Sequence, residues 1–222
     1  MHDAAKRAAA RAALAFVRPD RLLGVGTGST VAHFVDELGT SDVRPSRAVS
    51  TSCETDSLLR AIGVAVVPLQ SAHGPIDLYV DGADEIDALG RAIKGGGGAH
   101  TREKRVAHAA LTWVCIVDES KLVPHLGLRA AVPLEVERPG LPAVISVLHA
   151  WGASPRVREG WTADPLHALL DVSGLNLSDP AAVESQLESV PGVVACGVFA
   201  HRRADVILVG HPDGRTTTLR PT

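Results

Sequence analysis

The first half of the chain alternates short apolar segments with segments of helical periodicity, and this alternation restricts the fold more than any other feature. The pattern predicts strands in residues 21–26, 47–52, 64–69, 76–84 and 112–120. It predicts helices in residues 3–17, 28–38, 54–63 and 102–111. Strands that are separated by helices form parallel βαβ units. We therefore expect an α/β fold with a doubly wound, mostly parallel sheet, in which ligands bind at the carboxyl ends of the strands.

The order of elements changes near Arg129. From there the sequence predicts a strand, a helix, a hairpin, a helix and a strand, in residues 131–137, 141–152, 154–174, 179–192 and 193–200. This order is typical of a small α+β domain with an antiparallel sheet. A last apolar strand, residues 204–210, is expected to return to the first sheet. We therefore expect a Rossmann-like domain in residues 1–128 plus 204–222, and a smaller α+β domain in residues 129–203.

Composition and charge argue against several classes of protein. The 222 residues carry a net charge of −3 and no long basic run, so no nucleic-acid partner is expected. No apolar run approaches the length of a membrane helix, so no membrane partner is expected. The cysteines Cys53, Cys115 and Cys196 are far apart, with no C-x-x-C pair, which indicates neither a disulfide framework nor a zinc site. We expect Cys115 and Cys196 to be buried thiols, as fits a reducing cytoplasm.

Basic residues are used unevenly along the chain. The first segment is rich in Ala and Arg, as transit peptides are, but its apolar end at Leu14 and the Pro19-Asp20 stop favour an ordinary first helix. Arginine outnumbers lysine eighteen to four. Three of the four lysines, Lys94, Lys104 and Lys121, fall in motifs described below. A chain that prefers Arg is expected to keep Lys where a compact ammonium group is needed.

The segment GVGTGST, residues 24–30, follows a predicted strand and opens a predicted helix. Its glycines let backbone N–H groups approach an anion, and the helix N-terminus adds positive potential. The segment therefore predicts a phosphate or sugar-phosphate site, although a tight turn with a Ser or Thr cap has the same pattern. A dinucleotide fingerprint would need glycine in place of Ser29. The hydroxyl-rich segment STSCET, residues 50–55, fits either a helix cap at Ser52 or Thr55 or a share in the same anion pocket.

The segment KGGGGAHTREK, residues 94–104, is the most unusual of the chain. Four successive glycines have a large entropic cost, which is tolerable where backbone must pass close to a ligand. A flexible linker is the alternative. Lys94 begins this loop, and Glu103 lies in the first turn of the next predicted helix, where the helix dipole favours its anionic form. The segment VDESK ends another strand, so Lys121 faces either the same sheet edge or the surface.

The stretch YVDGADEID places four carboxylates in nine residues. The spacing differs from that of a calcium-binding EF-hand loop, whereas a magnesium site, a solvated turn and acid/base chemistry all fit. Asp81 and Asp84 flank a Gly-Ala turn at the end of a strand, so we expect both to face the pocket. Lys94 is the nearby cation that could stabilise them. We expect Glu85 and Asp87 to face water.

These motifs occur together in a recognisable order. GVGTGST, TSCET, YVDGADEID, KGGGGAHTREK and VDESK, at these spacings, resemble the type A ribose-5-phosphate isomerase family. The resemblance continues through VPLEV and residues 179–200 to residues 204–210, and so covers nearly the whole chain. Any one motif is moderate support, but five in register are strong.

The resemblance implies an aldose–ketose isomerase that interconverts D-ribose 5-phosphate and D-ribulose 5-phosphate in the non-oxidative pentose phosphate pathway. It implies that Glu103 is the base that moves a proton between C1 and C2 through an enediol(ate), with Asp81, Asp84 and Lys94 as the other catalytic residues. It implies a cytoplasmic homodimer or homotetramer with no metal or cofactor, and we expect the small domain to take part in oligomer contacts. The substrate-binding residues that it implies are Thr27, Gly28, Ser29, Thr30, Asp81, Gly82, Ala83, Asp84, Lys94, Gly95, Gly96, Gly97 and Lys121.

The residues suit this chemistry on their own terms. Proton abstraction beside a carbonyl needs a carboxylate base on a rigid element, as Glu103 would be at a helix start. The enediolate oxygen needs a fixed donor, which Lys94 and glycine N–H groups can supply. Opening of the furanose ring needs a second acid or base, and the sequence leaves that role open between Asp81 and Asp84. Three rivals stay open: a non-catalytic sugar-phosphate sensor, a magnesium-dependent sugar phosphatase, and an isomerase of another aldose phosphate.

Overall fold

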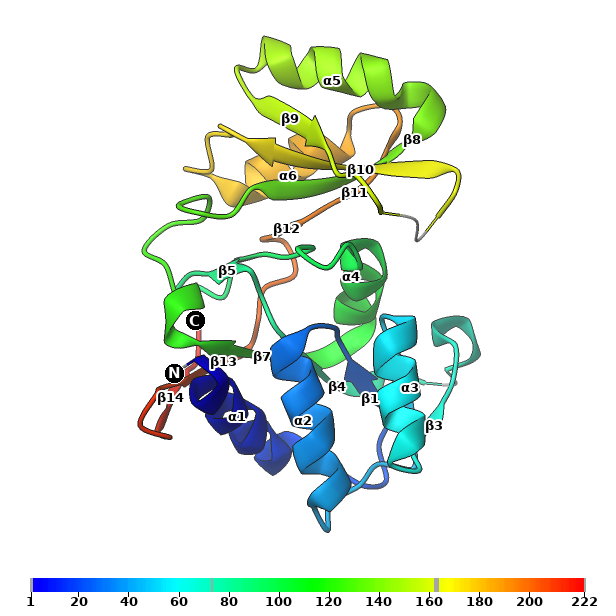
Figure 1. Ribbon diagram of the computed structural model, residues 1–222, viewed down its shortest axis with the longest axis vertical. Coiled ribbons are helices and arrows are strands. Elements are labelled where there is room, and N and C mark those ends of the chain that lie inside the picture. The colour runs from blue at the N-terminus through cyan, green and yellow to red at the C-terminus, as the bar shows by residue number, and fades with distance from the viewer. Residues whose placement is uncertain (1, 73, 162–163, 222) are drawn as a thin grey trace.

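The structure is a computed structural model that describes residues 2–72, 74–161 and 164–221. Two sheets dominate it, the larger in the lower half of Figure 1 and the smaller in the upper half. Both termini lie beside the larger sheet. No helix in the described part of the chain is long and apolar enough to cross a membrane.

The larger sheet has seven strands within the described residues, and it confirms the predicted doubly wound α/β fold. Five neighbouring pairs are parallel, and the pair at one edge is antiparallel. In sheet order the strands are β14 (Thr216–Leu219), β13 (Val206–Gly210), β7 (Ala110–Asp118), β4 (Ile76–Asp81), β1 (Leu23–Val25), β2 (Arg47–Ser50) and β3 (Ala65–Val66). Strands β2 and β3 follow β1 toward one edge of the sheet, whereas β4, β7 and β13 follow one another toward the other edge. The strand order therefore reverses between β1 and β4.

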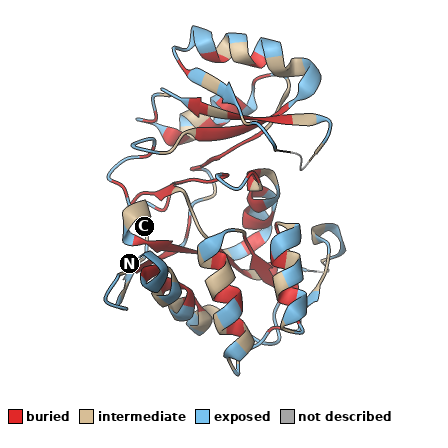
Figure 2. Cartoon of the chain, in the orientation of Figure 1, coloured by how far each residue is buried: buried red, intermediate tan, exposed pale blue. Residues whose placement is uncertain are grey.

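Both faces of the larger sheet are covered, because successive residues of a strand point to opposite sides. Leu78 and Val80 of β4 join the core beneath the helices of one face, while Tyr79 packs with Trp113 in the core on the other face. The central strands β13, β7, β4 and β1 are almost continuously buried (Figure 2). Helices α1 (His2–Ala13), α2 (Ser29–Thr40) and α3 (Cys53–Ala61) contribute to the first core, and α4 (His100–Ala109) to the second.

The smaller sheet confirms the predicted α+β order of strand, helix, hairpin, helix and strand. Its four strands in the described part of the chain are all antiparallel, in the order β11 (Val193–Cys196), β8 (Val132–Glu137), β10 (His167–Ser173) and β9 (Ser154–Val157). Helices α5 (Leu141–Ala150) and α6 (Pro180–Glu188) pack into its core. Strands β9 and β10 are the predicted hairpin, of which residues 162–163 lie outside the described residues. The domain boundaries at residues 128/129 and 203/204 stay a prediction.

A small third sheet was not predicted, because its strands have only two residues each. It joins β5 (Glu85–Ile86), β6 (Ala92–Ile93) and β12 (Val198–Phe199). The predicted strand over residues 193–200 is therefore two strands, broken at Gly197, where a Cβ atom would lie 2.3 Å from the Lys94 carbonyl oxygen. Strand β12 thus brings the second half of the chain against the start of the glycine loop. Short 3₁₀ helices occupy Leu14–Phe16, Leu69–Ser71, Glu119–Lys121 and Arg138–Gly140.

Two other elements differ from expectation. The strand predicted over residues 64–69 is only the two-residue edge strand β3, because Pro68 lies between it and a 3₁₀ turn. The edge strand β14 was not predicted, because its Thr-rich sequence is mostly exposed and has no apolar pattern. The last apolar strand, β13, returns to the first sheet beside β7 as predicted. Cys115 and Cys196 are buried free thiols, also as predicted.

The expectation that Glu85 and Asp87 face water is wrong. Each is only 2% exposed. Glu85 accepts hydrogen bonds from four successive backbone N–H groups of residues 127–130, at 2.5 to 3.2 Å. Asp87 accepts the backbone N–H groups of Leu89 and Arg91 and pairs with the Arg91 guanidinium. Backbone donors from later in the chain satisfy Glu85, and sequence patterning cannot reveal such partners.

Glu85 fixes the segment that leads from the larger sheet into the smaller one. We expect Glu85→Gln to lower the free energy of unfolding by about 3 kcal/mol, because an amide NH₂ would face N–H donors that now have a charged acceptor. Urea unfolding of the variant and wild type would measure the difference. The matched control is Glu159→Gln, at an exposed glutamate. Equal stability of wild type and both variants would contradict this role for Glu85.

Candidate active site

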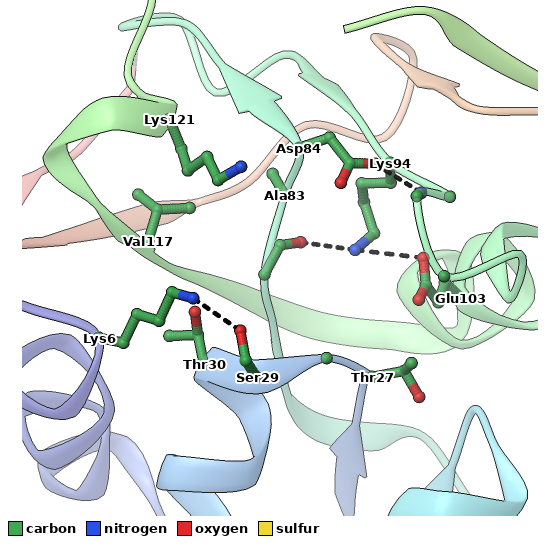
Figure 3. A pocket seen from close by; sticks show the side chains of 15 residues that line it. Lys6, Thr27, Ser29, Thr30, Ala83, Asp84, Lys94, Glu103, Val117 and Lys121 are labelled. Carbon is green, nitrogen blue, oxygen red and sulfur yellow. Dashed lines mark hydrogen bonds and ion pairs between the residues drawn. The ribbon is translucent and has the colours of Figure 1, made fainter. Parts of the chain in front are cut away.

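A cavity of about 170 Å³ lies at the carboxyl ends of β1 and β4, where the strand order reverses. Open α/β sheets bind ligands at this kind of position. Figure 3 shows two groups of side chains around it, with Lys6, Ser29, Thr30 and Lys121 at one end and Asp84, Lys94 and Glu103 at the other. The residues that line it are Lys6, Thr27, Gly28, Ser29, Thr30, Gly82, Ala83, Asp84, Lys94, Gly95, Gly96, Gly97, Glu103, Val117 and Lys121.

The cavity therefore brings together the sequence-predicted site residues, with one exception. Asp81 does not line it. Two lining residues, Lys6 and Val117, were not predicted. The composition could have indicated a role for Lys6. The chain has only four lysines beside eighteen arginines, and the other three lysines all fall in the motifs. Its helix lies far from every motif in the sequence, so only the fold connects it to the site.

At one end of the cavity, the Lys94 ammonium group lies between two carboxylates. Its Nζ atom is 2.7 Å from Asp81 Oδ2 and 3.3 Å from Glu103 Oε2, and it also donates to the Gly82 carbonyl at 2.6 Å. Lys94, Asp81 and Glu103 are 3%, 0% and 4% exposed. Like-charged carboxylates are tolerable at this depth only because the cation lies between them.

Burial and charge determine the protonation of this group. Burial raises the pKa of Glu103 to about 8; the Lys94 charge opposes this and the Asp81 charge adds to it. Burial lowers the pKa of Lys94, but the Asp81 and Glu103 charges outweigh burial, and the pKa of Lys94 rises above its ordinary value. Glu103 Oε2 is buried and forms no hydrogen bond within the described structure. Glu103 is thus a buried carboxyl group whose Oε2 atom has the Lys94 ammonium as its ion-pair partner, and its pKa of about 8 is suitable for a general base.

Asp81 lies behind Lys94 rather than in the cavity. Its carboxylate accepts hydrogen bonds from the Thr27 and Gly82 N–H groups, from the Tyr79 hydroxyl and from Lys94. Gly26 makes room for it, because a Cβ atom there would lie 1.8 Å from Asp81 Cγ. The prediction that Asp81 and Asp84 both face the pocket is therefore wrong for Asp81, because its oxygens are taken up by donors inside the protein.

Asp84 belongs to the cavity wall and contacts the glycine loop. Its Oδ2 atom accepts the Gly96 N–H at 2.7 Å. The loop must run close to Asp84, because a Cβ atom on Gly96 would lie 2.5 Å from Asp84 Oδ1. Lys94 contacts Asp81 and Glu103, but no ion pair joins it to Asp84 among the described residues. The lysine thus stabilises a different pair of carboxylates from the one that the sequence suggested.

The other end of the cavity is built to hold an anion. Helix α2 begins at Ser29 without a side-chain cap, so its first N–H groups and its dipole face the cavity. Gly28 has φ of 117°, a backbone conformation that disfavours side chains and lets the loop turn into the helix. The Lys6 ammonium donates to Ser29 Oγ at 2.8 Å, and Lys121 approaches from the opposite side (Figure 3).

Lys6 reaches this position because α1 packs closely on the sheet. Four alanines, Ala5, Ala9, Ala10 and Ala13, form its buried face. A Cβ atom on Gly210 of β13 would lie 1.8 Å from the Ala5 carbonyl oxygen, so only glycine permits this approach. The Ala-rich segment, expected as an ordinary first helix, therefore also delivers a cation to the cavity.

The hydroxyl-rich segment STSCET does not share the cavity. Ser52 is the N-cap of α3 and accepts the Thr55 N–H, which is the cap that the sequence allowed. Thr27 Oγ1 donates to Ser52 Oγ at 2.5 Å, and Thr55 Oγ1 donates to the Gly26 carbonyl at 2.7 Å. These hydroxyls hold the anion loop in place from behind. In the described part of the chain, no group of three or more His, Cys, Asp or Glu side chains is arranged to hold a metal ion.

Comparison with known proteins identifies relatives along nearly the whole chain. The family model described as ribose 5-phosphate isomerase A (phosphoriboisomerase A) matches residues 47–214. A curated relative, ribose-5-phosphate isomerase A of Acidithiobacillus ferrooxidans, is 46% identical over 212 residues, which cover 96% of each chain.

Solved structures agree with the sequence comparison. Ribose 5-phosphate isomerase A from Neisseria gonorrhoeae superposes with a TM-score of 0.95 at 39% identity, covering 100% of this chain and 98% of that one. A D-ribose-5-phosphate isomerase in complex with phospho-erythronic acid superposes with a TM-score of 0.91 at 33% identity, covering 99% of each chain. By sequence and by fold, the chain belongs to the ribose 5-phosphate isomerase A family.

Proposed function

We propose that this chain is an aldose–ketose isomerase that interconverts D-ribose 5-phosphate and D-ribulose 5-phosphate. One observation carries the proposal: a buried carboxyl group, Glu103, forms an ion pair with Lys94 at one end of a cavity whose other end has two lysines and a helix N-terminus. A sugar phosphate carries its reacting carbon and its phosphate at opposite ends. Family membership supports the same reaction.

In the proposed mechanism Glu103 is the base. Its carboxylate removes the proton from C2 of the open-chain aldose, which leaves an enediolate with its negative charge on O1. The O2 hydroxyl proton passes to O1, and Glu103 returns its proton to C1, so that the ketone forms at C2 with no net gain or loss of atoms. The Lys94 ammonium supplies the fixed positive charge that the enediolate oxygen needs.

The two aspartates would have different roles. The wall position of Asp84 favours it as the acid or base that opens the furanose ring, because it can reach a bound sugar. The four donors around Asp81 favour a positioning role, in which Asp81 holds the Lys94 ammonium in place. This division refines a choice that the sequence left open.

We propose that the phosphate binds at the N-terminus of α2, with Lys6, Ser29, Thr30 and Lys121 as its ligands. A phosphate at a helix N-terminus gains from free N–H groups and from the dipole. The relative solved with phospho-erythronic acid supports this class of ligand, because that molecule carries a phosphate and a carboxylate. Remote binding of the phosphate would orient the sugar for proton transfer.

The wider setting is also a proposal. We place the chain in the non-oxidative pentose phosphate pathway in the cytoplasm, acting as a homodimer or homotetramer without a metal or cofactor, with the small α+β unit in subunit contacts. The rival readings are a sugar-phosphate sensor, a magnesium-dependent phosphatase and an isomerase of another aldose phosphate. Formation of ribulose 5-phosphate in EDTA, in the assay that follows, would exclude the sensor and the magnesium-dependent phosphatase.

Glu103→Gln should keep the fold and lose turnover by about a thousandfold or more, because the amide cannot accept the C2 proton. The measurement is ribulose 5-phosphate formation from ribose 5-phosphate in the presence of EDTA, with Glu159→Gln as the control. Near-normal turnover of Glu103→Gln would refute its role as base. No product from folded wild type would favour the sensor or an isomerase of another aldose phosphate, and activity that EDTA abolishes would favour a metal-dependent enzyme.

The pH dependence should report the raised pKa of Glu103. The base acts as a carboxylate, so kcat/KM should fall as pH decreases through the pKa of the free enzyme. We expect the acid limb to lie near pH 8, far above the value of 4.5 for an ordinary glutamate, because burial raises this pKa. Initial rates between pH 5 and pH 10, on the order of one point per half unit, would measure it. A limb near 4.5 would show that the carboxyl group is not desolvated as argued.

Lys6→Met should raise KM for ribose 5-phosphate by about tenfold, since one charge-assisted contact to the phosphate is worth about 1.4 kcal/mol or more. The effect on kcat should be smaller, because the contact is made equally in the ground state and the transition state. The control is Arg7→Met on the same helix, whose guanidinium pairs with Glu37 instead. An unchanged KM would place the phosphate elsewhere.

A further inference from the structure

Two side chains that follow β9 hold the glycine loop that lines the cavity: Trp161 donates from Nε1 to the Gly98 carbonyl at 3.2 Å, and Arg158 binds the first two glycines. Arg158, which follows β9, donates from Nη1 to the carbonyl oxygens of both Gly95 and Gly96, at 3.0 and 2.9 Å. Asp171 of β10 orients the arginine, accepting from Nε at 2.8 Å and from Nη2. Arg158 itself does not line the cavity described above. It contacts the loop from outside.

These contacts fix which way the loop N–H groups point. In a trans peptide the C=O and the following N–H point in opposite directions, and the chain has no cis peptide among its described residues. Turning the Gly95 carbonyl toward Arg158 therefore turns the Gly96 N–H the other way, where it donates to Asp84 at 2.7 Å. By the same geometry, the Gly96 carbonyl on Arg158 directs the Gly97 N–H toward the cavity side of the loop.

The Gly97 N–H is available to a ligand. Within the described part of the chain it has no hydrogen-bond acceptor, whereas the Gly98 N–H bonds to the Gly95 carbonyl and the Gly96 N–H to Asp84. Gly97 lines the cavity together with Lys94 and Glu103. A fixed backbone donor here would stabilise the charge that develops on a reacting oxygen.

Four successive glycines would otherwise sample many orientations of these peptide planes. The planar guanidinium suits the task of restraint, because it can bind a carboxylate through one edge and backbone carbonyls through another. Its aspartate partner lies on the face of the smaller sheet opposite the apolar core that contains Leu170 and Val172. The guanidinium group of Arg158 thus holds the loop at Gly95 and Gly96, while Trp161 and Leu169 lie against Gly98.

We propose that Arg158, oriented by Asp171, is a positioning residue for the isomerisation. It sets the peptide planes of Gly95 to Gly97 so that the Gly97 N–H acts with Lys94 on the enediolate oxygen. The inference rests on the proposed function for its catalytic consequence, while the restraint of the loop stands on the contacts alone.

The test compares Arg158→Lys and Asp171→Asn with the control Arg156→Lys, at an exposed arginine of the same strand region. Two readouts are needed: steady-state kinetics with ribose 5-phosphate, and hydrogen exchange of the peptide that contains residues 94–99. We expect kcat of Arg158→Lys to fall by about tenfold to a hundredfold, with KM within about threefold of wild type. Exchange in the loop should become faster, and Asp171→Asn should shift both readouts in the same direction.

Guanidinium ions added to Arg158→Ala should restore part of the lost turnover and slow the loop exchange. Unchanged kcat and loop exchange in Arg158→Lys would overturn the proposal. So would a loss that lies entirely in KM, because Arg158 would then bind substrate directly. If Arg158→Lys does not fold, the same criteria applied to Asp171→Asn decide. An inactive wild type whose loop is still loosened by Arg158→Lys would refute the proposed function and leave the loop restraint intact.

Discussion

The buried ammonium group of Lys94 is the interaction on which the site depends. Without it, the pKa of Glu103 would rise further, because burial and the Asp81 charge would act on this carboxyl group with no opposing cation beside it. Removing one partner of a buried ion pair typically costs about 3–5 kcal/mol, because the remaining charge loses its compensation. The Tyr79 hydroxyl and two backbone N–H groups donate to the Asp81 carboxylate in addition to Lys94. Asp81 is therefore fully bonded inside the protein, on the side of Lys94 away from the cavity. Glu103 lines the cavity, pairs with Lys94 and has a raised pKa.

The second half of the chain provides much of the support for this arrangement. Lys104, next to Glu103 in sequence, points away from the cavity and donates to Glu184 at 2.6 Å and to the Val198 carbonyl at 2.7 Å. The neighbouring Gly197 carbonyl accepts the Lys94 N–H at 2.9 Å. The same short segment therefore holds both the helix that carries Glu103 and the backbone of Lys94. Residues 197–198, in the second half of the chain, are thus part of the structure of the site.

The two ends of the cavity follow different physical principles. The anion end uses peptide dipoles and cations that are partly solvated, where a phosphate can exchange its water for N–H donors at modest cost. The reacting end uses fully buried charges, where a small change in position or protonation has a large electrostatic effect. The substrate proposed here spans both ends, so that binding energy from the phosphate can serve chemistry at the other end of the sugar.

The sequence by itself determined the architecture and most of the cavity lining. Strand and helix periodicity predicted the parallel sheet and the antiparallel one, and the loops at strand ends supplied Thr27 to Thr30, Asp84, Lys94 and Glu103, because in such sheets these loops meet at one edge. Tertiary structure decided what each charge contacts. Glu85 was expected to face solvent but accepts hydrogen bonds from a distant backbone segment. Asp81 was expected in the cavity but lies behind Lys94. Lys6 lines the cavity and Arg158 binds the glycine loop, although both come from elements distant in the sequence. The physical reason is that periodicity reports which face of an element is apolar, whereas the partner of a buried polar group depends on donors that any part of the chain can bring to it.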